Sequence, residues 1–409
     1  MDKINILYKY RFREIYFIRG KEVLNLHWTN IKSFVIHKDY DGYVRPQYVL
    51  TLQLDHKTNI WISRHQNDFL VYLDIQKVLT DDMGDQIGPT TQFMKGLFIA
   101  INPTSSSVSV DRLQDIDGKP INVVETNDLS EMMVGSPVTI GLIQRDMYNR
   151  SMTAANTIVE KDNLQNIVVS MLTRGGFKKA LISPFQNYKI YEDIVIPAYP
   201  LYKAIQYLDY KYGFHKAGTV IFYDYDIVYM IDTSMKSPVY RSGGSPYTTL
   251  NIFESTKNII NGHATGTSAR ELFVANATTN IVFAEDFTTS GGSTTTVVDI
   301  NTAEKTPVTY PSSNMNPLES ASVTYGTTQA AEYVQQRQLE NRVRITISGY
   351  HYDIDSFNPN VLTSIYHSNP DIQSRIAGKY RVSTVMCEMH NQGDNFVANT
   401  AVSYVYCGK

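Results

Sequence analysis

Apolar and polar positions alternate with a period of two along about the first 145 residues. The alternating runs are INILYKY, EIYFIRG, SFVIHKD, YVLTLQLD, IWISRH, FLVYLDI, GLFIAINP, PINVVET and PVTIGLIQRD. Alternation of this kind puts one face of a strand against a core and the other against solvent. Turn-forming residues, such as Asp41-Gly42 and Asp55-His56-Lys57, separate the runs. Because no helical pattern intervenes, the region predicts an antiparallel barrel or sandwich.

The period becomes helical in the segment KDNLQNIVVSMLTRGGF, where apolar residues recur three and four positions apart. Either Asp162 or Asn163 can cap the start of this helix, because a short polar side chain can accept from the first free backbone N–H groups. Either Gly175 or Gly176 can end it. The segment therefore predicts one amphipathic helix.

A second helix is expected to begin at Pro200, which is favoured in a first helical turn, and to stop at Gly213. Strands are expected on both sides of it, in YEDIVIP, GTVIFYDYD and IVYMIDT. The stretch from about residue 155 to 235 is therefore predicted to form a small α/β unit.

From about residue 240 the period of two returns. Strands are expected in TTLNIFES, RELFVAN, NIVFAED, TTTVVDIN, VRITISGY, VLTSIYHS, KYRVSTVMCEMH and FVANTAVSYVYC. The runs TTSGGSTTT and PSSNMNPLESASVTYGTT have the composition of exposed loops, and a polar helix is expected from Gln329 to Asn341.

The chain is thus predicted to be mixed and β-dominated, with two antiparallel β-barrel domains, an α/β insert and additional peripheral β elements. Its 409 residues are enough for two to four domains. The predicted division is residues 1–150 for the first barrel, 151–238 for the α/β domain and 239–409 for the second barrel-like domain. A peripheral loop-rich insert is expected around 285–340.

Composition narrows the possible functions. Apolar residues make up 43% and charged residues 19% of the chain, which indicates a globular protein. The formal net charge is −3 and the charges are interspersed, so no basic face for nonspecific nucleic-acid binding is expected. The 29 Tyr, against 16 Phe and 2 Trp, suit half-buried sheets and large, partly wet interfaces.

The two cysteines, Cys387 and Cys407, fit folding in a reducing cytoplasm, and two free buried thiols are favoured over a disulfide. The first residues mix charge into every turn and lack the apolar core of a signal peptide. No window approaches the ~18 consecutive apolar residues of a membrane helix. The expectation is a soluble protein without a membrane-spanning segment that is not exported by the general pathway.

The stretch FYDYDIVYMID, residues 222–232, has two interpretations. Asp224 and Asp226 lie two apart and, on a strand, would share a face, as in glycosyltransferases that bind a divalent cation. The same letters also describe an acidic turn between the apolar strands VIFY and IVYMI. The turn is favoured, because tyrosines rather than glycines or further acids flank the pair.

A second candidate metal set is His351, Asp353 and Asp355, which alternate in SGYHYDIDSFNP. Imidazole and carboxylate groups can hold a divalent metal if a further ligand comes from elsewhere. Asn358-Pro359 marks a strand end, however, where solvated His and Asp are common. The chain also lacks a Gly-x-Ser-x-Gly elbow and a phosphate-binding loop. No catalytic, cofactor-binding or metal residue is therefore assigned.

The order of these units resembles the central baseplate hub proteins of contractile-tailed bacteriophages. The opening is similar in NIKSFVIHKDYDGYVRPQYVLTLQLD and NDFLVYLDIQK, where such hubs begin a tube-like barrel. The middle is similar in the helix ending at Tyr212-Gly213-Phe214 and the following strand pair TVIFYDYDIVYMIDT. The strands from NRVRITISGY to ANTAVSYVYC look like a second barrel closing. Residues 243 to 325 match least.

The resemblance implies a structural, non-enzymatic homotrimer without a cofactor. Each subunit would contribute two tube-like barrels, so that three subunits adapt a sixfold tail tube to a threefold spike and form a channel for DNA in transit. The implied partners are the central spike protein, a tail tube or tube-initiator protein, baseplate wedge proteins and the tape-measure protein. The implied location is the tail baseplate of the virion, after assembly in the bacterial host cytoplasm.

Two alternatives stay open at this point. One is a metal-dependent glycosyltransferase or hydrolase that uses one of the acidic sets. The other is a different tail component, either a tube protein or a distal tail adaptor protein.

Overall fold

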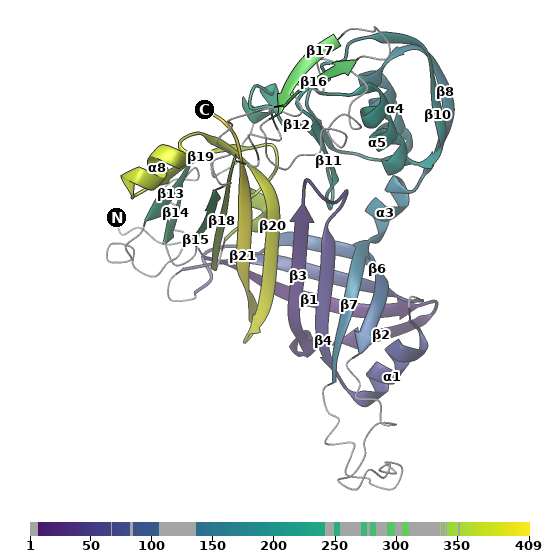
Figure 1. Ribbon diagram of the computed structural model, residues 1–409. Coiled ribbons are helices and arrows are strands. Elements are labelled where there is room, and N and C mark those ends of the chain that lie inside the picture. Colours follow the sequence, from purple (N-terminus) through teal and green to yellow (C-terminus); the bar gives the residue numbers. More distant parts are fainter. Residues whose placement is uncertain are drawn as a thin grey trace, which may run out of the picture.

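The computed structural model describes residues 7–66, 68–81, 85–105, 136–241, 249–253, 271–275, 279–283, 293–298, 305–310, 336, 340, 342–350 and 352–409. Figure 1 shows a β-barrel, an α/β unit above it and a second group of strands beside it. The run PINVVET, the polar loops and His351 lie outside the described residues, as does the helix expected from Gln329 to Asn341 apart from positions 336 and 340.

Eight strands close into an antiparallel ring, in the order β1-β5-β6-β7-β4-β3-β20-β21 and back to β1. Their bounds are β1 Leu7–Arg19, β3 Ile31–Asp39, β4 Gln47–Leu54, β5 Leu70–Thr80, β6 Thr91–Ser105, β7 Ser136–Gln144, β20 Lys379–Gln392 and β21 Asn395–Gly408. In addition, β2 (Glu22–Leu26) forms a hairpin with β1, and the 3₁₀ turn η1 (Trp28–Asn30) precedes β3. The last two strands therefore complete a ring that the first strands begin.

Side chains fill the inside of this ring. Phe12 of β1 contacts Phe34 of β3 and Phe396 of β21, with ring centroids 5.7 and 4.6 Å apart. Tyr48 of β4 contacts Phe98 of β6 at 5.4 Å. The alternation predicted from sequence supplies these inward residues, and eight strands leave just enough interior for side chains. The barrel is thus a packed core and has no pore along its own axis.

One predicted strand is wrong. The run IWISRH lies in helix α1 (His56–Arg64), and Asp55 caps it, because its side chain accepts from the Thr58 N–H at 2.8 Å. The presumed turn Asp55-His56-Lys57 is therefore a helix start. Trp61 of this helix packs on Phe69 with ring centroids 5.4 Å apart.

The runs INILYKY and EIYFIRG, predicted as two strands, belong to the single strand β1 over its described length.

A second sheet is built on the same final hairpin. Its order is β14-β13-β19-β20-β21-β18-β15. The added strands are β13 Thr249–Phe253, β14 Glu271–Ala275, β15 Thr279–Phe283, β18 Val343–Tyr350 and β19 Leu362–His367, with helix α8 (Pro370–Ile376) beside β19. The hairpin β16 (Ser293–Val298) and β17 (Lys305–Tyr310) lies within the predicted insert.

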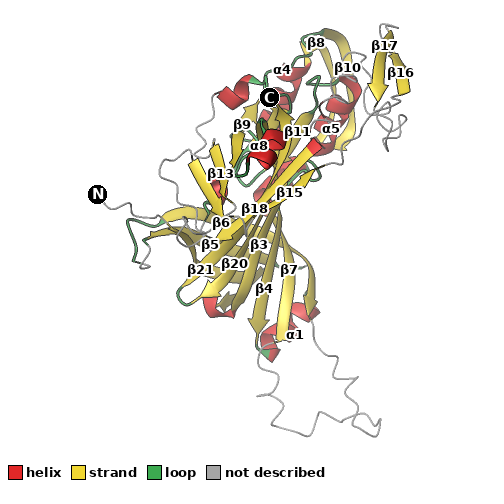
Figure 2. Cartoon of the chain, turned by 60° about the vertical axis from the view of Figure 1, so that its left-hand side comes forward, coloured by secondary structure: helices red, strands yellow, loops and turns green. Residues whose placement is uncertain are grey.

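The two sheets use different parts of the hairpin β20–β21. Residues 384–390 of β20 pair with β3, whereas residues 379–381 pair with β19. On β21, residues 396–397 pair with β1 and residues 399–405 with β18. Figure 2 shows β21, β20, β3, β4 and β7 side by side in this order. The predicted β-dominated fold class is confirmed, and the division of the chain at residues 150 and 238 stays a prediction.

The α/β unit has a core of its own. It contains α3 Arg145–Ser151, β8 Ala154–Asn163, α4 Leu164–Arg174, β9 Ala180–Ile182, β10 Ile190–Pro200, α5 Leu201–Tyr212, β11 Thr219–Tyr223 and β12 Val228–Asp232, followed by the 3₁₀ turn η4 (Pro238–Arg241). The antiparallel ribbon of β8 and β10 packs on α4 and α5, while β11 and β12 form a hairpin.

Both predicted helices of this unit are confirmed. Asn163 caps α4 by accepting from the Asn166 N–H at 2.9 Å, and Gly175 ends it. Pro200 precedes α5 as its capping residue, and Gly213 ends α5 with φ +68°, a value that glycine adopts without strain.

Two further expectations can be compared with the structure. Cys387 and Cys407 are free and buried, which confirms the predicted thiols. None of the helices in the described parts of the chain has the length and apolar character needed to span a membrane.

Candidate functional site

The acidic pair of FYDYDIVYMID lies in the turn between β11 and β12, so the predicted turn is confirmed. The Asp224 N–H donates to the Ile227 carbonyl at 2.9 Å, which closes the turn. The two carboxylates then bind different lysines. Asp224 Oδ2 lies 2.7 Å from Lys38 Nζ, and Asp226 Oδ2 lies 2.6 Å from Lys179 Nζ. Their side chains therefore do not converge on one position.

The Lys38–Asp224 pair is buried between the barrel and the α/β unit. Lys38 of β3 is 8% exposed and Asp224 is 5% exposed. Burial alone lowers the pKa of Lys38, but Asp224, with smaller contributions from Tyr48 and Asp355, raises it more, so the net shift is upward. A buried lysine that stays charged requires its partner, so the pair fixes the turn to the barrel.

Backbone contacts hold the same turn against the barrel. The Tyr225 hydroxyl accepts from the Lys95 N–H of β6 at 2.8 Å and donates to the Lys95 carbonyl. The Tyr223 N–H donates to the Val44 carbonyl at 2.7 Å. Because bonds on both sides of Asp224 reach different barrel segments, the turn has one defined position on the barrel.

The second acidic set also binds a lysine. Lys77 Nζ of β5 lies 2.5 Å from Asp353 Oδ1 and 2.7 Å from Asp355 Oδ2. Burial lowers the pKa of Lys77, but the two carboxylates raise it more, so the net shift is upward. The expectation of an extended segment is wrong here, because Asp353 caps the 3₁₀ turn η7 (Ile354–Ser356). This pairing joins the barrel to the segment after β18.

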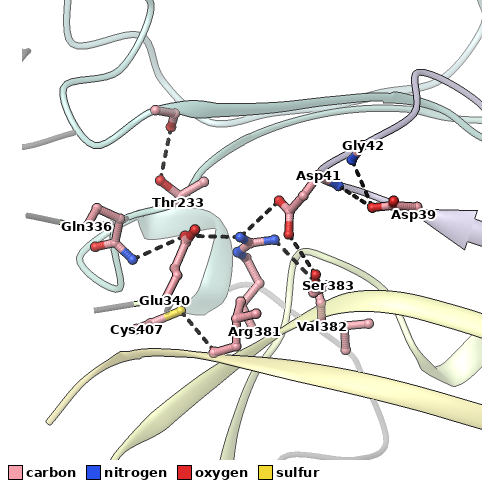
Figure 3. A network of polar contacts seen from close by, with 12 residues as sticks. Asp39, Asp41, Gly42, Thr233, Gln336, Glu340, Arg381, Val382, Ser383 and Cys407 are labelled. Atoms are coloured by element: carbon pink, nitrogen blue, oxygen red, sulfur yellow. Dashed lines mark hydrogen bonds and ion pairs between the residues drawn. The ribbon is translucent and has the colours of Figure 1, made fainter. Parts of the chain in front are cut away.

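A third cluster surrounds Arg381, which is fully buried on β20 (Figure 3). Its Nη2 lies 3.1 Å from Asp41 Oδ1 and 3.0 Å from Glu340 Oε1. The Ser383 hydroxyl donates to Asp41 Oδ2 at 2.7 Å. Burial alone lowers the pKa of Arg381, but these carboxylates hold it above its usual value. The cluster ties the turn after β3 to the shared hairpin.

We call these three clusters the junction: Lys38 with Asp224, Lys77 with Asp353 and Asp355, and Arg381 with Asp41 and Glu340. Each joins a strand of the barrel to another part of the chain. Within the described residues, no three His, Cys, Asp or Glu side chains are grouped as a metal site would require. What the junction does chemically is neutralise buried charge and hold the parts of the chain in fixed positions.

Sequence reasoning did not find the cationic members of the junction. Their partners are far away along the chain, 186 positions for Lys38 and Asp224. One signal was available. Lys38 follows the inward residues Phe34 and Ile36 at the same alternation, so a lysine occupies a core position of a strand. A charged residue at such a position indicates a buried ion pair.

The α/β unit contains a further polar relay at the end of α5, in which His215 is buried and Asp209 and Thr219 are partly buried. Asp209 Oδ1 accepts from the Phe214 N–H at 2.9 Å and lies 3.1 Å from the Thr219 hydroxyl. The same hydroxyl lies 3.0 Å from His215 Nδ1, and His215 Nε2 lies 3.2 Å from the Ser183 carbonyl. Burial raises the pKa of Asp209 to about 6 and lowers that of His215 to about 4.

Comparison with solved structures shows the class of fold. A tail protein from Neisseria meningitidis MC58 matches with a TM-score of 0.50 and 9% identity, over 98% of this chain and 96% of that one. A 43 kDa tail protein of prophage MuSo2 from Shewanella oneidensis matches at 0.48 and 10% identity, over 95% and 96% of the two chains. The chain thus shares the fold of the Neisseria tail protein.

The family follows from the sequence itself. Residues 5–405 match the family described as bacteriophage PBS1 gene 109 protein, and the chain belongs to this family. The resemblance to phage tail hub proteins is confirmed at the level of this phage family and this fold. No individually curated protein sequence matches the chain.

A more distant match is an Escherichia coli protein, c3393, described as a type VI secretion component with structural similarity to the T4 phage tail proteins gp27 and gp5. It matches at a TM-score of 0.42 and 8% identity, over 97% of this chain and 76% of that one.

Proposed function

We propose that this protein is a structural hub subunit of a phage tail baseplate, which assembles as a trimer around a channel for DNA. The observation that supports this most directly is the hairpin β20–β21, which belongs to both the eight-stranded barrel and the second sheet. One chain thereby carries two sheet units in a fixed relation. Three copies would present six such units to a sixfold tube while keeping threefold symmetry for a spike.

Because the barrel interior is packed, we propose that the DNA channel lies between subunits of the ring and not along the axis of a single barrel. Aromatic side chains fill the ring interior, so DNA cannot pass along the axis of a single barrel. A closed ring of subunits leaves a space on its own symmetry axis. A net charge of −3 suits such a channel, because each phosphate that a protein neutralises adds to binding and slows passage.

The junction supports a mechanical role. A subunit that transmits force between a tube and a spike must keep its parts aligned, and buried ion pairs resist displacement strongly once formed. In this role the central spike protein and a tube or tube-initiator protein would bind opposite ends of the ring. Wedge and tape-measure proteins would complete its contacts, and the assembled protein would lie in the virion.

Two measurements test the proposal. Native mass spectrometry of the purified full chain, alone and mixed with the candidate spike protein, is expected to show a trimer. A chain that stays monomeric at high concentration under both conditions would contradict the hub role. Quantitative mass spectrometry of purified virions is expected to give three copies per tail, whereas six copies would favour a tube or distal tail adaptor protein.

A further inference from the structure

A groove of about 470 Å³ lies on the outer face of the barrel, over β4, β7 and β6. The side chains of Val49, Ile101 and Ile143 line it, and Gly141 leaves part of its floor without a side chain. Val49 lies between Tyr48 and Leu50, which point into the ring, so it faces outward. The volume is within the range of about 300–1,000 Å³ that is typical of binding sites.

Among the described residues that line this groove, Arg45 is the one that carries a charge. Its guanidinium lies over the rings of Tyr148, at 5.1 Å, and Tyr202, at 5.7 Å. Its Nη1 atom is buried and has no hydrogen-bond partner among the described residues. Burial lowers the pKa of Arg45, although the neighbouring tyrosines partly oppose this shift. A buried donor without an acceptor is costly, so the folded chain leaves this group in need of one.

Asp224 is the acid that shares a cavity with Arg45 among the described residues, and it is already engaged. Asp224 and Arg45 both line a small cavity next to the groove. However, Asp224 Oδ2 bonds to Lys38 at 2.7 Å, and its Oδ1 accepts from the Tyr225 N–H at 2.8 Å. The structure records no ion pair of Arg45 with any described carboxylate. The acceptor that suits Arg45 must therefore come from outside the described part of the chain.

The sheet beneath the groove limits how a ligand can bind. β4 pairs with β3 and β7, and β6 pairs with β5 and β7, so no strand under the groove has a free edge. An incoming strand cannot extend this sheet, and recognition must depend on side chains. One guanidinium between apolar walls matches a single carboxylate with apolar neighbours, whereas a nucleic-acid backbone needs several cations.

We propose that this groove binds a segment of another protein chain in which one Asp or Glu is flanked by apolar side chains. The carboxylate bonds to the Arg45 guanidinium, which the two tyrosine rings already hold in place. The flanking side chains lie on Val49, Ile101 and Ile143. Charge complementarity selects the segment, and apolar contact contributes the remaining affinity.

The test uses the full chain and three probes: the peptide acetyl-Val-Glu-Leu-Val-amide, the same peptide with Gln in place of Glu, and acetate. Binding is followed by amide NMR signals of Val49 and Gly141 and by the Nε–H signal of Arg45. The Glu peptide is expected to shift these signals saturably and to bind at least about tenfold more tightly than the Gln peptide, since a buried charge-assisted bond is lost. Acetate is expected to bind more weakly than the Glu peptide.

Variants separate the charge of Arg45 from its effect on folding. Arg45→Gln is expected to abolish the preference for Glu, and Arg45→Lys to keep part of it, because lysine retains the charge without the planar fork. Lys203→Gln removes an exposed cation from α5, next to Tyr202, and is expected to keep the full preference.

Three results would overturn the proposal. The first is equal affinity of the Glu and Gln peptides, or no saturable shift up to the solubility of either. The second is acetate binding as tightly as the Glu peptide, which would indicate a site for free small anions. The third is self-association of the chain that depends on Arg45 while neither peptide binds, which would make a second copy the occupant.

Discussion

Replacing Asp209 by Asn is expected to stabilise the α/β unit at neutral pH and to have little effect near pH 4. Burial raises the pKa of Asp209 from 3.8 to about 6, so the folded unit favours the neutral carboxyl. A group whose pKa is raised on folding adds stability below its unfolded pKa and loses it as pH rises through the folded pKa. At 1.36 kcal/mol per pKa unit, the shift corresponds to about 3 kcal/mol.

Burial favours the neutral carboxyl at this position, whereas the Phe214 N–H and the Thr219 hydroxyl donate to Asp209 Oδ1 and partly oppose the rise in its pKa. The Thr219 hydroxyl has one hydrogen and lies between Asp209 and His215 Nδ1. That hydroxyl donates to Asp209 Oδ1, so an amide oxygen at this position can accept the same hydrogen bond. An amide at position 209 keeps an acceptor for the Phe214 N–H without the charge.

The assay is hydrogen–deuterium exchange of peptides from residues 201–232, corrected for the intrinsic pH dependence of exchange. The opening free energy of Asp209→Asn minus that of the wild type is expected to rise from near zero at pH 4 to as much as about 3 kcal/mol at pH 7. Asp193→Asn, an exposed position on β10, is the matched control. A difference that is constant from pH 4 to pH 7, or that falls as pH rises, would refute the reasoning.

The Asp209→Asn variant also separates the contribution of His215 to the pH dependence of stability from that of Asp209. The pKa of His215 falls from 6.5 to about 4 on folding, so its contribution is lost as pH decreases through this range, which is opposite in direction to Asp209. In the wild type the two trends offset each other between about pH 4 and pH 6. In Asp209→Asn the loss on acidification should appear alone.

Two further variants test other parts of the fold. Lys38→Met leaves the Asp224 carboxylate buried without its partner and is expected to cost about 3–5 kcal/mol in urea unfolding. The double variant Lys38→Met with Asp224→Asn should recover most of this loss of stability. As the control, Lys179→Met breaks the exposed pair with Asp226 and should not change the stability measurably. Equal losses of stability in Lys38→Met and Lys179→Met would argue against the buried pair. Asp55→Ala removes the cap of α1 and is expected to cost about 1 kcal/mol by the same assay, and an unchanged midpoint would contradict that capping role.

The parts of the fold that could be predicted from sequence have local causes. Asn163, Gly175 and Gly213 act within one helical turn of their own positions, and the strands flanking Asp224 alternate clearly. Helix α1 was missed because IWISRH also fits a strand period, and the side-chain cap at Asp55 decides between the two. Short apolar runs are ambiguous in this way.

The parts that could not be predicted depend on distant pairings. Nothing near residues 384–390 indicates that they pair with β3, more than 340 positions earlier. The same holds for the acids of the junction. Asp224 and Asp353 were visible as candidates, but the lysines that bind them lie on strands at the other end of the chain. Loop-closure entropy and packing of the whole chain determine such contacts.

The shared hairpin also sets the timing of folding during synthesis. The sixth ring strand ends at Gln144, but the two strands that close the ring begin only at Lys379. At translation rates of about 5–20 residues per second, the 234 residues between them take roughly 10–50 s to make. For that period β1 and β3 each lack the ring neighbour that β21 or β20 later supplies, so the nascent barrel has two unpaired edges. Chaperones are therefore expected to bind these edges on ribosome-bound chains, and only a chain translated through β21 can complete the ring.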